Sequence, residues 1–239
     1  MEFLYLDKVD STNKWAKENI DTLKDKTLIY TGNQTSGRGR LNRKWTFAGA
    51  DNVYASIILK PSDEMKSIYS NLTQYLCVKL CEVFEQYGVN PKIKWPNDIL
   101  INGKKISGIL AEGVIREGKL KGLILGFGVN LNTSIEVLSS IDKPATSLNI
   151  ELNKDIDRED FLKTLTSKFC LMYDEFIEKG FLLIKDDYIR RAEFLNKEVT
   201  VNVYDTPICG IVNGINDEGA LLLSDKNNRK HILLIGDIL

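Results

Sequence analysis

The chain has little of several residue types on which common active sites depend. Its 239 residues include one histidine, His231, and four cysteines. A single histidine makes a Ser-His-Asp triad or a histidine-based metal centre hard to build, and no G-x-S-x-G sequence marks a nucleophilic serine. No G-x-x-x-x-G-K-[ST] sequence occurs either, which excludes a Walker A phosphate loop. These absences remove most hydrolase chemistry and the P-loop class of nucleotide-binding proteins.

The chain also lacks a cysteine framework and any long apolar run. The cysteines have neither disulfide nor zinc-site spacing, and we expect all four to be reduced, packed thiols of a cytoplasmic protein; they are Cys77, Cys81, Cys170 and Cys209. The N-terminus, MEFLYLDKVD, meets an acidic residue at once, which argues against a signal peptide. The longest charge-free run, 122–135, contains two asparagines and is too short to cross a bilayer. The sequence therefore predicts a protein that does not span a membrane.

Excess charge of either sign is absent as well. Lys and Arg total 32 against 33 for Asp and Glu, and the net charge is −1, which is not the broad basic character of a nucleic-acid-binding protein. One segment departs from this balance, because residues 34–45, QTSGRGRLNRKW, carry four positive charges and no carboxylate. Three interpretations are open for it: a nucleic-acid arm, a loop that binds a small anion, or a solvated surface loop.

Hydrophobic patterns predict an α+β protein. Apolar runs and helical periodicity indicate strands at 3–6, 27–31, 52–59 and 120–132 and helices at about 13–20, 68–88 and 157–179. Asn102-Gly103 is typical of a hairpin turn. After residue 194 only short β-like runs occur, separated by glycine, proline and asparagine. We therefore predict two domains, an α+β domain at 1–193 around a mixed or antiparallel central sheet flanked by helices, and a small β-barrel at 194–239.

Three polar clusters are candidates for ligand chemistry. In the basic segment, Gly37 and Gly39 allow close backbone approach, while Arg38 and Arg40 offer forked donors to a carboxylate or phosphate. The second cluster joins a proline-driven turn to an adjoining hairpin, and it contains Lys94, Asn97, Asp98, Lys105 and Gly108. The third consists of Asn130 and Asn132 at a strand end. Each cluster alone fits a charged hairpin or ordinary turn chemistry, but together they suggest a nucleotide-dependent site that activates a carboxylate.

Five motifs in order resemble those of biotin-protein ligases. They are S-T-N at 11–13, Q-x-x-G-R-G-R at 34–40 followed by Trp45, K-W-P-N-D at 94–98, G-K-K-I-S-G-I at 103–109 and G-x-G-V-N-L-N at 126–132. The resemblance extends from residue 11 into the β-rich tail. It implies a class II synthetase-like catalytic domain with an SH3-like C-terminal domain. It also implies a two-step reaction, in which biotin and MgATP form biotinyl-5'-AMP and a carrier-protein lysine then takes the biotinyl group.

The resemblance also implies roles for individual residues. Ser11, Thr12 and Gln34 would bind the polar ureido end of biotin, with Gly37, Arg38 and Gly108 helping to form its pocket. Lys105, Arg40 and Asp98 would be catalytic, and Asp98 would hold Mg²⁺. The complete set implied to bind biotin or ATP is Ser11, Thr12, Asn13, Gln34, Gly37, Arg38, Gly39, Arg40, Trp45, Lys94, Asn97, Lys105, Gly108, Asn130 and Asn132.

The implied partner is the biotin carboxyl carrier domain of a biotin-dependent carboxylase. Because the first motif begins at residue 11, the sequence leaves no room for the DNA-binding domain of some family members, and we expect no specific DNA binding. A homodimer stays open. Leu41-Asn42 stands where this family often has another glycine, and Asn42 is expected to accept a positive φ there. Two other functions remain as alternatives, a lipoate-protein ligase and a biotin or nucleotide sensor without catalysis.

Overall fold

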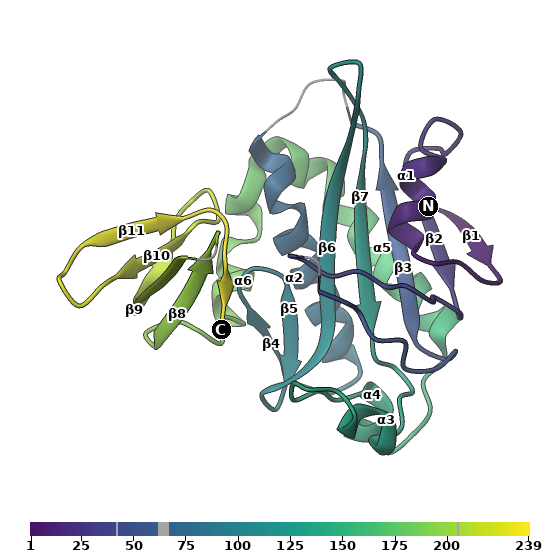
Figure 1. Ribbon diagram of the computed structural model, residues 1–239. Helices are drawn as coiled ribbons and strands as arrows, with labels where there is room; N and C mark the ends of the chain where they lie inside the picture. The colour runs from purple at the N-terminus through teal and green to yellow at the C-terminus, as the bar shows by residue number, and fades with distance from the viewer. Residues whose placement is uncertain (42, 62–66, 205) are drawn as a thin grey trace. The chain divides into compact units, whose positions relative to one another are not determined.

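The computed structural model describes residues 1–41, 43–61, 67–204 and 206–239. The strands form two sheets, one ordered β1-β2-β3-β7-β6-β5-β4 and one ordered β11-β10-β9-β8-β12 (Figure 1). The protein is thus a mixed α+β fold with a separate antiparallel C-terminal sheet, as the sequence predicts. The chain divides into two compact units, which are Met1–Lys66 with Ile101–Ser167 and Ser67–Leu100 with Lys168–Leu239.

The first unit contains five strands of the large sheet. They are β1 (Glu2–Leu6), β2 (Thr27–Thr31), β3 (Val53–Leu59), β6 (Lys104–Arg116) and β7 (Lys119–Val129). β1 runs parallel to β2, and the pairs β2–β3, β3–β7 and β7–β6 are antiparallel. Every residue of β2 and β3 is buried, which is why their sequences read as continuous apolar runs.

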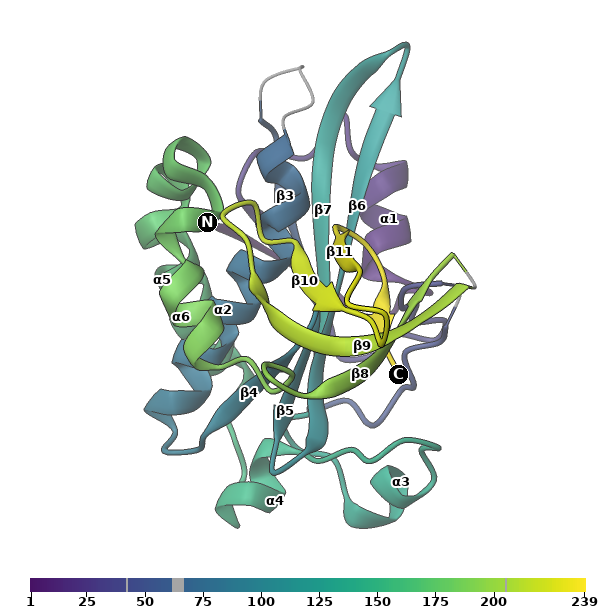
Figure 2. The same cartoon turned by 90° about the vertical axis from the view of Figure 1, so that its left-hand side faces the viewer.

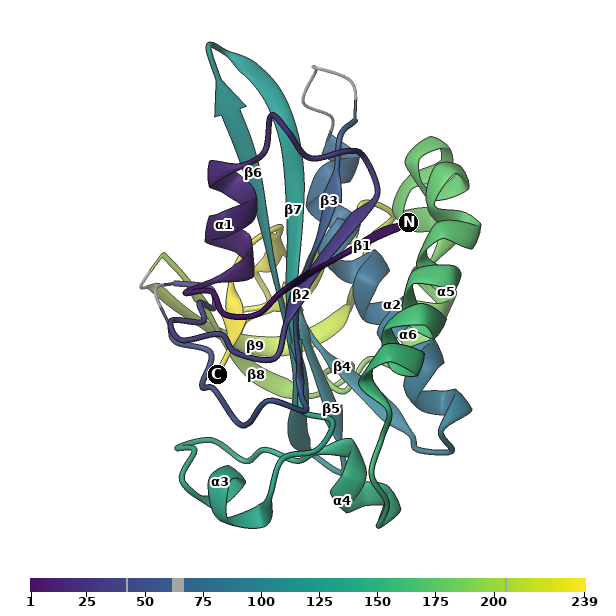
Figure 3. The same ribbon diagram turned by 90° about the vertical axis from the view of Figure 1, so that its right-hand side faces the viewer.

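Helix α1 (Thr12–Glu18) covers part of this sheet (Figure 3). It begins one residue earlier and ends two residues earlier than its pattern predicts. Ser11 is its N-cap and accepts a hydrogen bond from the backbone N–H of Lys14 at 3.4 Å, which satisfies one of the free amides of the first turn. Ala16 and Ile20 are fully buried in one cluster with Ile29, Ile58 and Ile124. This core holds the S-T-N segment against the strands.

Two-residue turns shape the strands around β6. Asn102 and Gly103 have φ values of 51° and 74°, which is the left-handed geometry expected of a hairpin turn. They connect β5 (Asp98–Ile101) to β6, as predicted. Glu117 and Gly118 repeat this geometry with φ values of 52° and 73°. They make β6 and β7 a long hairpin (Figure 1), and the sequence does not reveal this turn because glutamate is uncommon at a positive φ.

Three further helices belong wholly or partly to the first unit. They are α3 (Ile135–Ser139), α4 (Leu148–Leu152) and α5 (Arg158–Lys179). The periodicity of residues 157–179 predicts α5, whereas α3 and α4 are too short to produce a periodic pattern. At the first turn of α5, Glu159 accepts a hydrogen bond from the Tyr30 hydroxyl at 3.0 Å. This bond attaches the start of α5 to β2.

The second unit begins around a helix that is buried on nearly all sides. Its first elements are η1 (Ser67–Asn71), α2 (Leu72–Gln86), β4 (Pro91–Lys94), η2 (Gly180–Leu183) and α6 (Lys185–Arg190). Tyr75 of α2 stacks on Phe176 of α5, with ring centroids 4.4 Å apart, and its hydroxyl donates to the carbonyl of Phe169 at 2.6 Å. Gly88, at φ 86°, follows the helix end predicted for it.

The C-terminal sheet of the second unit is antiparallel throughout (Figure 2). Its strands are β8 (Glu198–Val203), β9 (Thr206–Ile215), β10 (Leu221–Ser224), β11 (Lys230–Leu233) and β12 (Asp237–Ile238). In the described residues its strand order is β11-β10-β9-β8-β12, which confirms the β-rich tail expected from sequence, and closure of this sheet into a barrel stays a prediction.

The tail also makes hydrogen bonds to α2 and its N-cap. Asn71 and Gln74 donate through their side-chain amides to the carbonyls of Glu218 and Gly219, each at 2.9 Å. These bonds join the tail to α2 within one compact unit. The division into domains 1–193 and 194–239 therefore stays a prediction.

All four cysteines lie in the described residues and none forms a disulfide, but only two of them are packed as expected. Cys77 and Cys81 are buried in α2, and burial raises the pKa of the Cys81 thiol. Cys170 is half-buried and Cys209 is exposed. Among the described residues, no helix combines the length and the apolar character needed to span a bilayer.

Candidate functional site

The first unit brings the S-T-N segment alongside the start of the basic segment. Val9 donates its backbone N–H to Asn33 at 3.0 Å and accepts from Thr35 at 3.0 Å, while Asp10 accepts from Ser36 at 2.7 Å. These parallel backbone bonds place the residues after Val9 next to those after Asn33. Two of the motifs identified by sequence are therefore neighbours in space.

A buried polar network links these two segments. The Gln34 carboxamide oxygen accepts from the backbone N–H of Thr12 at 2.9 Å and lies 3.3 Å from the Thr12 hydroxyl. The Ser56 hydroxyl of β3 lies 2.8 Å from the Thr12 hydroxyl, within hydrogen-bond distance. Thr12, Gln34 and Ser56 are at most 8% exposed, so their donors and acceptors have fixed directions. Such a set can recognise an uncharged polar group by complementary hydrogen bonds.

The side chain of Asn13 has a clear role within the fold. Its amide nitrogen donates to the carbonyl of Leu110 at 3.2 Å and to a carboxylate oxygen of Glu112 at 2.8 Å. Its oxygen lies 2.6 Å from the Ser56 hydroxyl. Asn13 thus joins α1 to β3 and β6, and its contact with a ligand stays a prediction.

The basic segment folds back on itself as a small hairpin. Trp45 donates its backbone N–H to Gly37 at 2.9 Å, and Gly39 donates to Arg43 at 2.7 Å. Leu41 takes the positive φ, at 52°, where the sequence argument assigned that geometry to Asn42, which lies outside the described residues. A leucine at this φ is strained because its Cβ crowds the backbone.

The two arginines of the segment lie in different surroundings. Arg38 is exposed and places Nη2 3.6 Å from Oε2 of Glu112 on β6. Arg40 is half-buried. A guanidinium offers five N–H donors in one plane. Arg38 and Arg40 thus offer donors suited to a carboxylate or phosphate, and binding of such an anion by this hairpin stays a prediction.

Trp45 lies over a pair of glycines that face each other on β6 and β7. Gly108 and Gly128 are direct partners in the register. A methyl group on Gly128 would lie 2.5 Å from Cζ2 of the Trp45 indole, and one on Gly108 would lie 3.0 Å from Cζ3. The indole occupies the space that side chains would take. Gly108 is among the residues predicted from sequence but Gly128 is not, although the G-x-G of residues 126–128 is a signal for it.

Lys105 approaches the same indole. Its Nζ lies 5.6 Å from the ring centroid of Trp45 and 3.1 Å from the position of a methyl group on Gly108. Its backbone is held on both sides, donating to Pro144 and accepting from Thr146, each at 2.9 Å. The ammonium is thus placed on a rigid strand beside Trp45, where a positive charge over an aromatic face is favourable.

Asn130 and Asn132 follow β7 and tie down the next segment. Asn130 donates its side-chain amide to Thr146 at 3.0 Å, and Asn132 exchanges hydrogen bonds with the backbone of Ile156 at 2.8 and 2.9 Å. Asn52, which the sequence argument missed, accepts from Leu131 at 2.8 Å through its buried side chain. These amides order the residues after β7, and ligand binding by the predicted pair remains untested.

Lys94, Asn97 and Asp98 belong to the second unit. All three are half-buried, at the end of β4, in the turn, and at the start of β5. Their turn contains a cis peptide bond between Trp95 and Pro96. Their membership of one site with the basic segment stays a prediction.

The described residues contain no group of three or more His, Cys, Asp or Glu side chains that could hold a metal ion. Mg²⁺ at nucleotide sites is held by one or two carboxylates together with phosphate oxygens. The predicted ligand Asp98 is one carboxylate of this kind. The donor set therefore fits an ion that enters with a nucleotide, and does not fit a dedicated protein cage.

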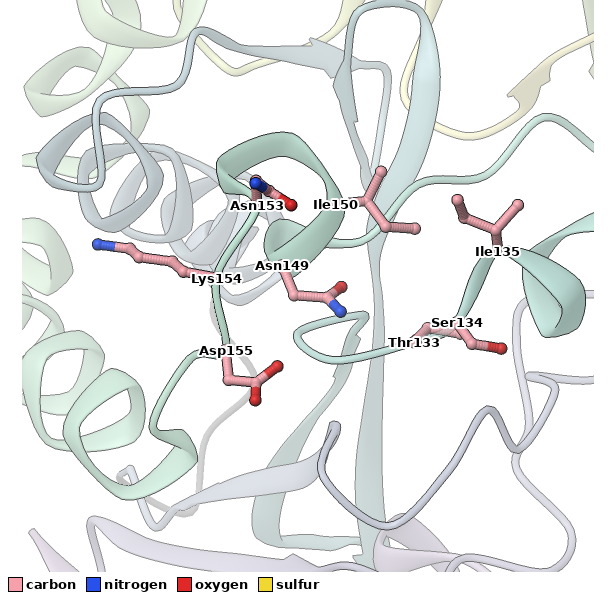
Figure 4. A pocket seen from close by; sticks show the side chains of 8 residues that line it. All are labelled: Thr133, Ser134, Ile135, Asn149, Ile150, Asn153, Lys154 and Asp155. Carbon is pink, nitrogen blue, oxygen red and sulfur yellow. The ribbon is translucent and has the colours of Figure 1, made fainter.

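A separate pocket of about 520 Å³ lies beside the segment that follows β7 (Figure 4). It is open, and none of the predicted site residues lines it. The lining residues are Thr133, Ser134, Ile135, Asn149, Ile150, Asn153, Lys154 and Asp155. Figure 4 shows that Lys154 points away from Ile135 and Ile150, so the pocket offers no concentration of positive charge for an anion.

Comparison with known proteins identifies two protein-ligase families in the chain. Residues 4–130 match the Biotin/lipoate A/B protein ligase family, and residues 194–238 match the Biotin protein ligase C terminal domain. The Bifunctional ligase/repressor BirA of Bacillus spizizenii is 32% identical over 232 residues, covering 96% of this chain and 71% of that protein. The Biotin--[acetyl-CoA-carboxylase] ligase of Paracoccus denitrificans is 28% identical, covering 95% and 96%.

A solved structure agrees over the whole chain. The biotin protein ligase from Aquifex aeolicus in complex with biotin and ATP superimposes with a TM-score of 0.84 at 28% identity, covering 100% of this chain and 97% of that one. The fold, the order of motifs and both family matches point the same way. The chain therefore belongs to the biotin/lipoate A/B protein ligase family and is a ligase of the biotin protein ligase type.

Proposed function

We propose that this ligase uses MgATP to activate biotin and then biotinylates a lysine of a biotin carboxyl carrier domain. In the first step a biotin carboxylate oxygen attacks the α-phosphorus of ATP, giving biotinyl-5'-AMP and pyrophosphate. In the second step the lysine ε-amine attacks the acyl carbon, AMP leaves and the amine loses a proton. The observation that supports this best is the buried Thr12–Gln34–Ser56 network beside a hairpin that carries Arg38 and Arg40.

The proposed roles follow from the chemistry of each group. Thr12 and Gln34, with Ser11, bind the uncharged ureido end of biotin, because their donors and acceptors are buried and directed. Arg38, Arg40 and Lys105 attract the biotin carboxylate and the ATP phosphates. Two anions repel each other as they approach, and charge grows on the α-phosphate in the transition state, so fixed cations stabilise that state more than the separated reactants.

The residues proposed to bind ATP come from the second unit and from the end of β7. Asn97 would contact the phosphates, and Asp98 would hold Mg²⁺, which would supply positive charge to neutralise them. The resemblance to biotin-protein ligases implies a role at the phosphates for Asn130 as well. A closed hairpin above the adenylate excludes water from a mixed anhydride that would otherwise hydrolyse.

The direct test is transfer of labelled biotin to a purified carrier domain in the presence of MgATP. We expect label on one lysine of the carrier and release of pyrophosphate. Adenylation and transfer of lipoate in place of biotin would favour the lipoate ligase alternative. Biotin binding with no pyrophosphate release would favour a sensor without catalysis.

Two glycine-to-alanine variants test whether the Trp45 indole helps to bind biotin. Gly128→Ala forces the Trp45 indole off β7, and overpacking of this kind costs about 1–3 kcal/mol, so biotin affinity should fall about tenfold. Gly113→Ala is the control on the same hairpin, because its methyl group would lie 3.8 Å from Leu120 and Leu123 in ordinary contact. Calorimetric titration with biotin measures both. Equal biotin affinities of the two variants would contradict a role for Trp45 in biotin binding.

A further inference from the structure

Glu112 is an acidic side chain that contacts two of the predicted ligand-binding segments. Its Oε2 accepts from the Asn13 amide at 2.8 Å and lies 3.6 Å from Nη2 of Arg38. The Glu112 side chain is 23% exposed, against 46% for Arg38. One carboxylate oxygen therefore faces both α1 and the basic hairpin.

The Asn13 contact connects Glu112 to the polar network. Asn13 donates to Leu110 and Glu112 through its nitrogen, so its oxygen is turned toward Ser56, at 2.6 Å. Ser56 bonds Thr12, and Thr12 bonds Gln34. Glu112 thus lies at one end of a chain of hydrogen bonds whose other end is the carboxamide proposed to recognise biotin.

The backbone of Glu112 is held within a sheet, whereas that of its partner Arg38 is not. Glu112 pairs with Ile124 in the centre of the β6–β7 ladder, with Leu110 and Val114 paired on either side. Arg38 lies on an exposed hairpin instead. The carboxylate is thus a fixed point from which an arginine on a less constrained segment can be held.

We propose that Glu112 is a positioning residue, which holds Arg38 next to the Thr12–Gln34 network and so prepares the hairpin for the carboxylate of the substrate. This inference rests on the proposed function. Holding a long side chain in advance reduces the entropy lost when the substrate binds. An ion pair at 3.6 Å engages one edge of the guanidinium and leaves the planar fork able to meet an anion.

The test is Glu112→Gln, which keeps an oxygen acceptor for Asn13 and removes the charge that attracts Arg38. Half-exposed ion pairs contribute up to about 1 kcal/mol, so we expect the biotin dissociation constant to rise about 3- to 5-fold. The melting temperature should change little. In an Arg38→Met background, where the ion pair is already absent, Glu112→Gln should change affinity less than about 2-fold. An unchanged constant, or the same factor in both backgrounds, would overturn the proposal.

Asp21→Asn is the matched control, because Asp21 pairs with Arg116 near the far end of β6. It removes a comparable exposed ion pair from the same strand and should leave biotin affinity unchanged. Glu112→Ala, which also removes the acceptor of Asn13, should weaken binding further, and Glu112→Gln should restore part of that loss. If the role of Glu112 were purely structural, the loss of biotin affinity in each Glu112 variant would instead parallel the drop in its melting temperature.

A second measurement does not depend on biotin. Trypsin cleavage after Arg38 and Arg40 in the free protein should become several-fold faster in Glu112→Gln and stay the same in Asp21→Asn. Unchanged cleavage would refute the hold on Arg38 even in a protein that biotinylates normally. If Glu112→Gln is cleaved faster but the wild-type protein neither binds nor transfers biotin, the proposed function is refuted and only the hold of Glu112 on Arg38 remains.

Discussion

Lys105→Ala should lose on the order of 100-fold or more in biotinyl-5'-AMP formation, the size of effect seen when one fixed charge-stabilising donor is removed from a catalytic site. Its ammonium lies 5.6 Å from the Trp45 ring, on a strand whose backbone is held by Pro144 and Thr146. In the proposed reaction it lowers the repulsion between carboxylate and α-phosphate and then stabilises the charge of the transition state. Pyrophosphate release measures this step directly.

The neighbouring lysine provides the control. Lys104 is exposed, whereas Lys105 is half-buried and its side chain lies against Gly108 and Trp45. Lys104→Ala should therefore form adenylate at nearly the normal rate. Lys105→Ala should remain folded, because lysine side chains seldom contribute to a core.

Chemically prepared biotinyl-5'-AMP separates the two steps. When the adenylate is supplied, Lys105→Ala should recover a larger share of single-turnover transfer than of pyrophosphate release, because activation is bypassed. Near-normal pyrophosphate release by a well-folded Lys105→Ala protein would refute the assignment. Equal losses in both steps would move Lys105 from activation to a general role in binding the adenylate.

Arg191→Met should have the largest effect on stability, lowering the free energy of unfolding by about 3 kcal/mol, the lower part of the range for breaking a buried ion pair. The side chain is 3% exposed and makes two bonds of 2.7 Å to the carboxylate of Glu85. It also donates to the backbone carbonyl of Asp187 at 2.9 Å. The carbonyl of Arg191 accepts from Ile93 at 2.7 Å, so the same residue holds β4, which leads into the K-W-P-N-D turn.

The stability that Arg191 provides should depend on pH. Its hydrogen bonds hold the pKa of Glu85 below the ordinary value. A carboxyl group whose folded-state pKa is lowered adds stability above its unfolded pKa, about 4.3 for glutamate, and loses it as the pH falls through the folded pKa. The difference between wild type and Arg191→Met should therefore be full at pH 7 and shrink below about pH 4. Urea unfolding at the two pH values measures it.

Arg190 is the matched control for this experiment. It is the adjacent arginine, with a side chain 60% exposed, and it pairs with Asp187 at 2.8 Å. Exposed pairs contribute about 0–1 kcal/mol, so Arg190→Met should change stability little. If the two variants were equally destabilised, burial of Arg191 would not be the source of its contribution.

Local features of the sequence predict the main elements well. The apolar run of 27–31 is β2, the pattern of 68–88 contains α2, and Asn102-Gly103 forms the turn expected of it. These features depend on side-chain period and turn geometry over a few residues, which the sequence states directly. The short helices α3 and α4 and the second turn, at Glu117-Gly118, carry no such local signal.

The motifs of the candidate site could be identified in the same way, because each is a short stretch with distinctive chemistry. Their partners could not. Glu112 meets Asn13 across 99 residues of sequence, Ser56 meets Thr12 across 44, and Arg191 meets Glu85 across 106. No local feature of the sequence indicates which residues pair across such separations.

The long helices, the main strands, the order of the motifs and the charged groups available for chemistry can all be predicted from the sequence. The contacts of Trp45 with Gly108 and Gly128, and of Glu112 with Arg38, are visible only in the folded chain. The physical reason is strand register. Neighbouring residues on a strand point to opposite faces of the sheet. A shift of one residue between β6 and β7 would therefore separate Gly108 from Gly128 and change which face of the sheet carries Glu112 relative to β7. That register is set by the burial of the whole sheet and by its turns, which no single motif contains.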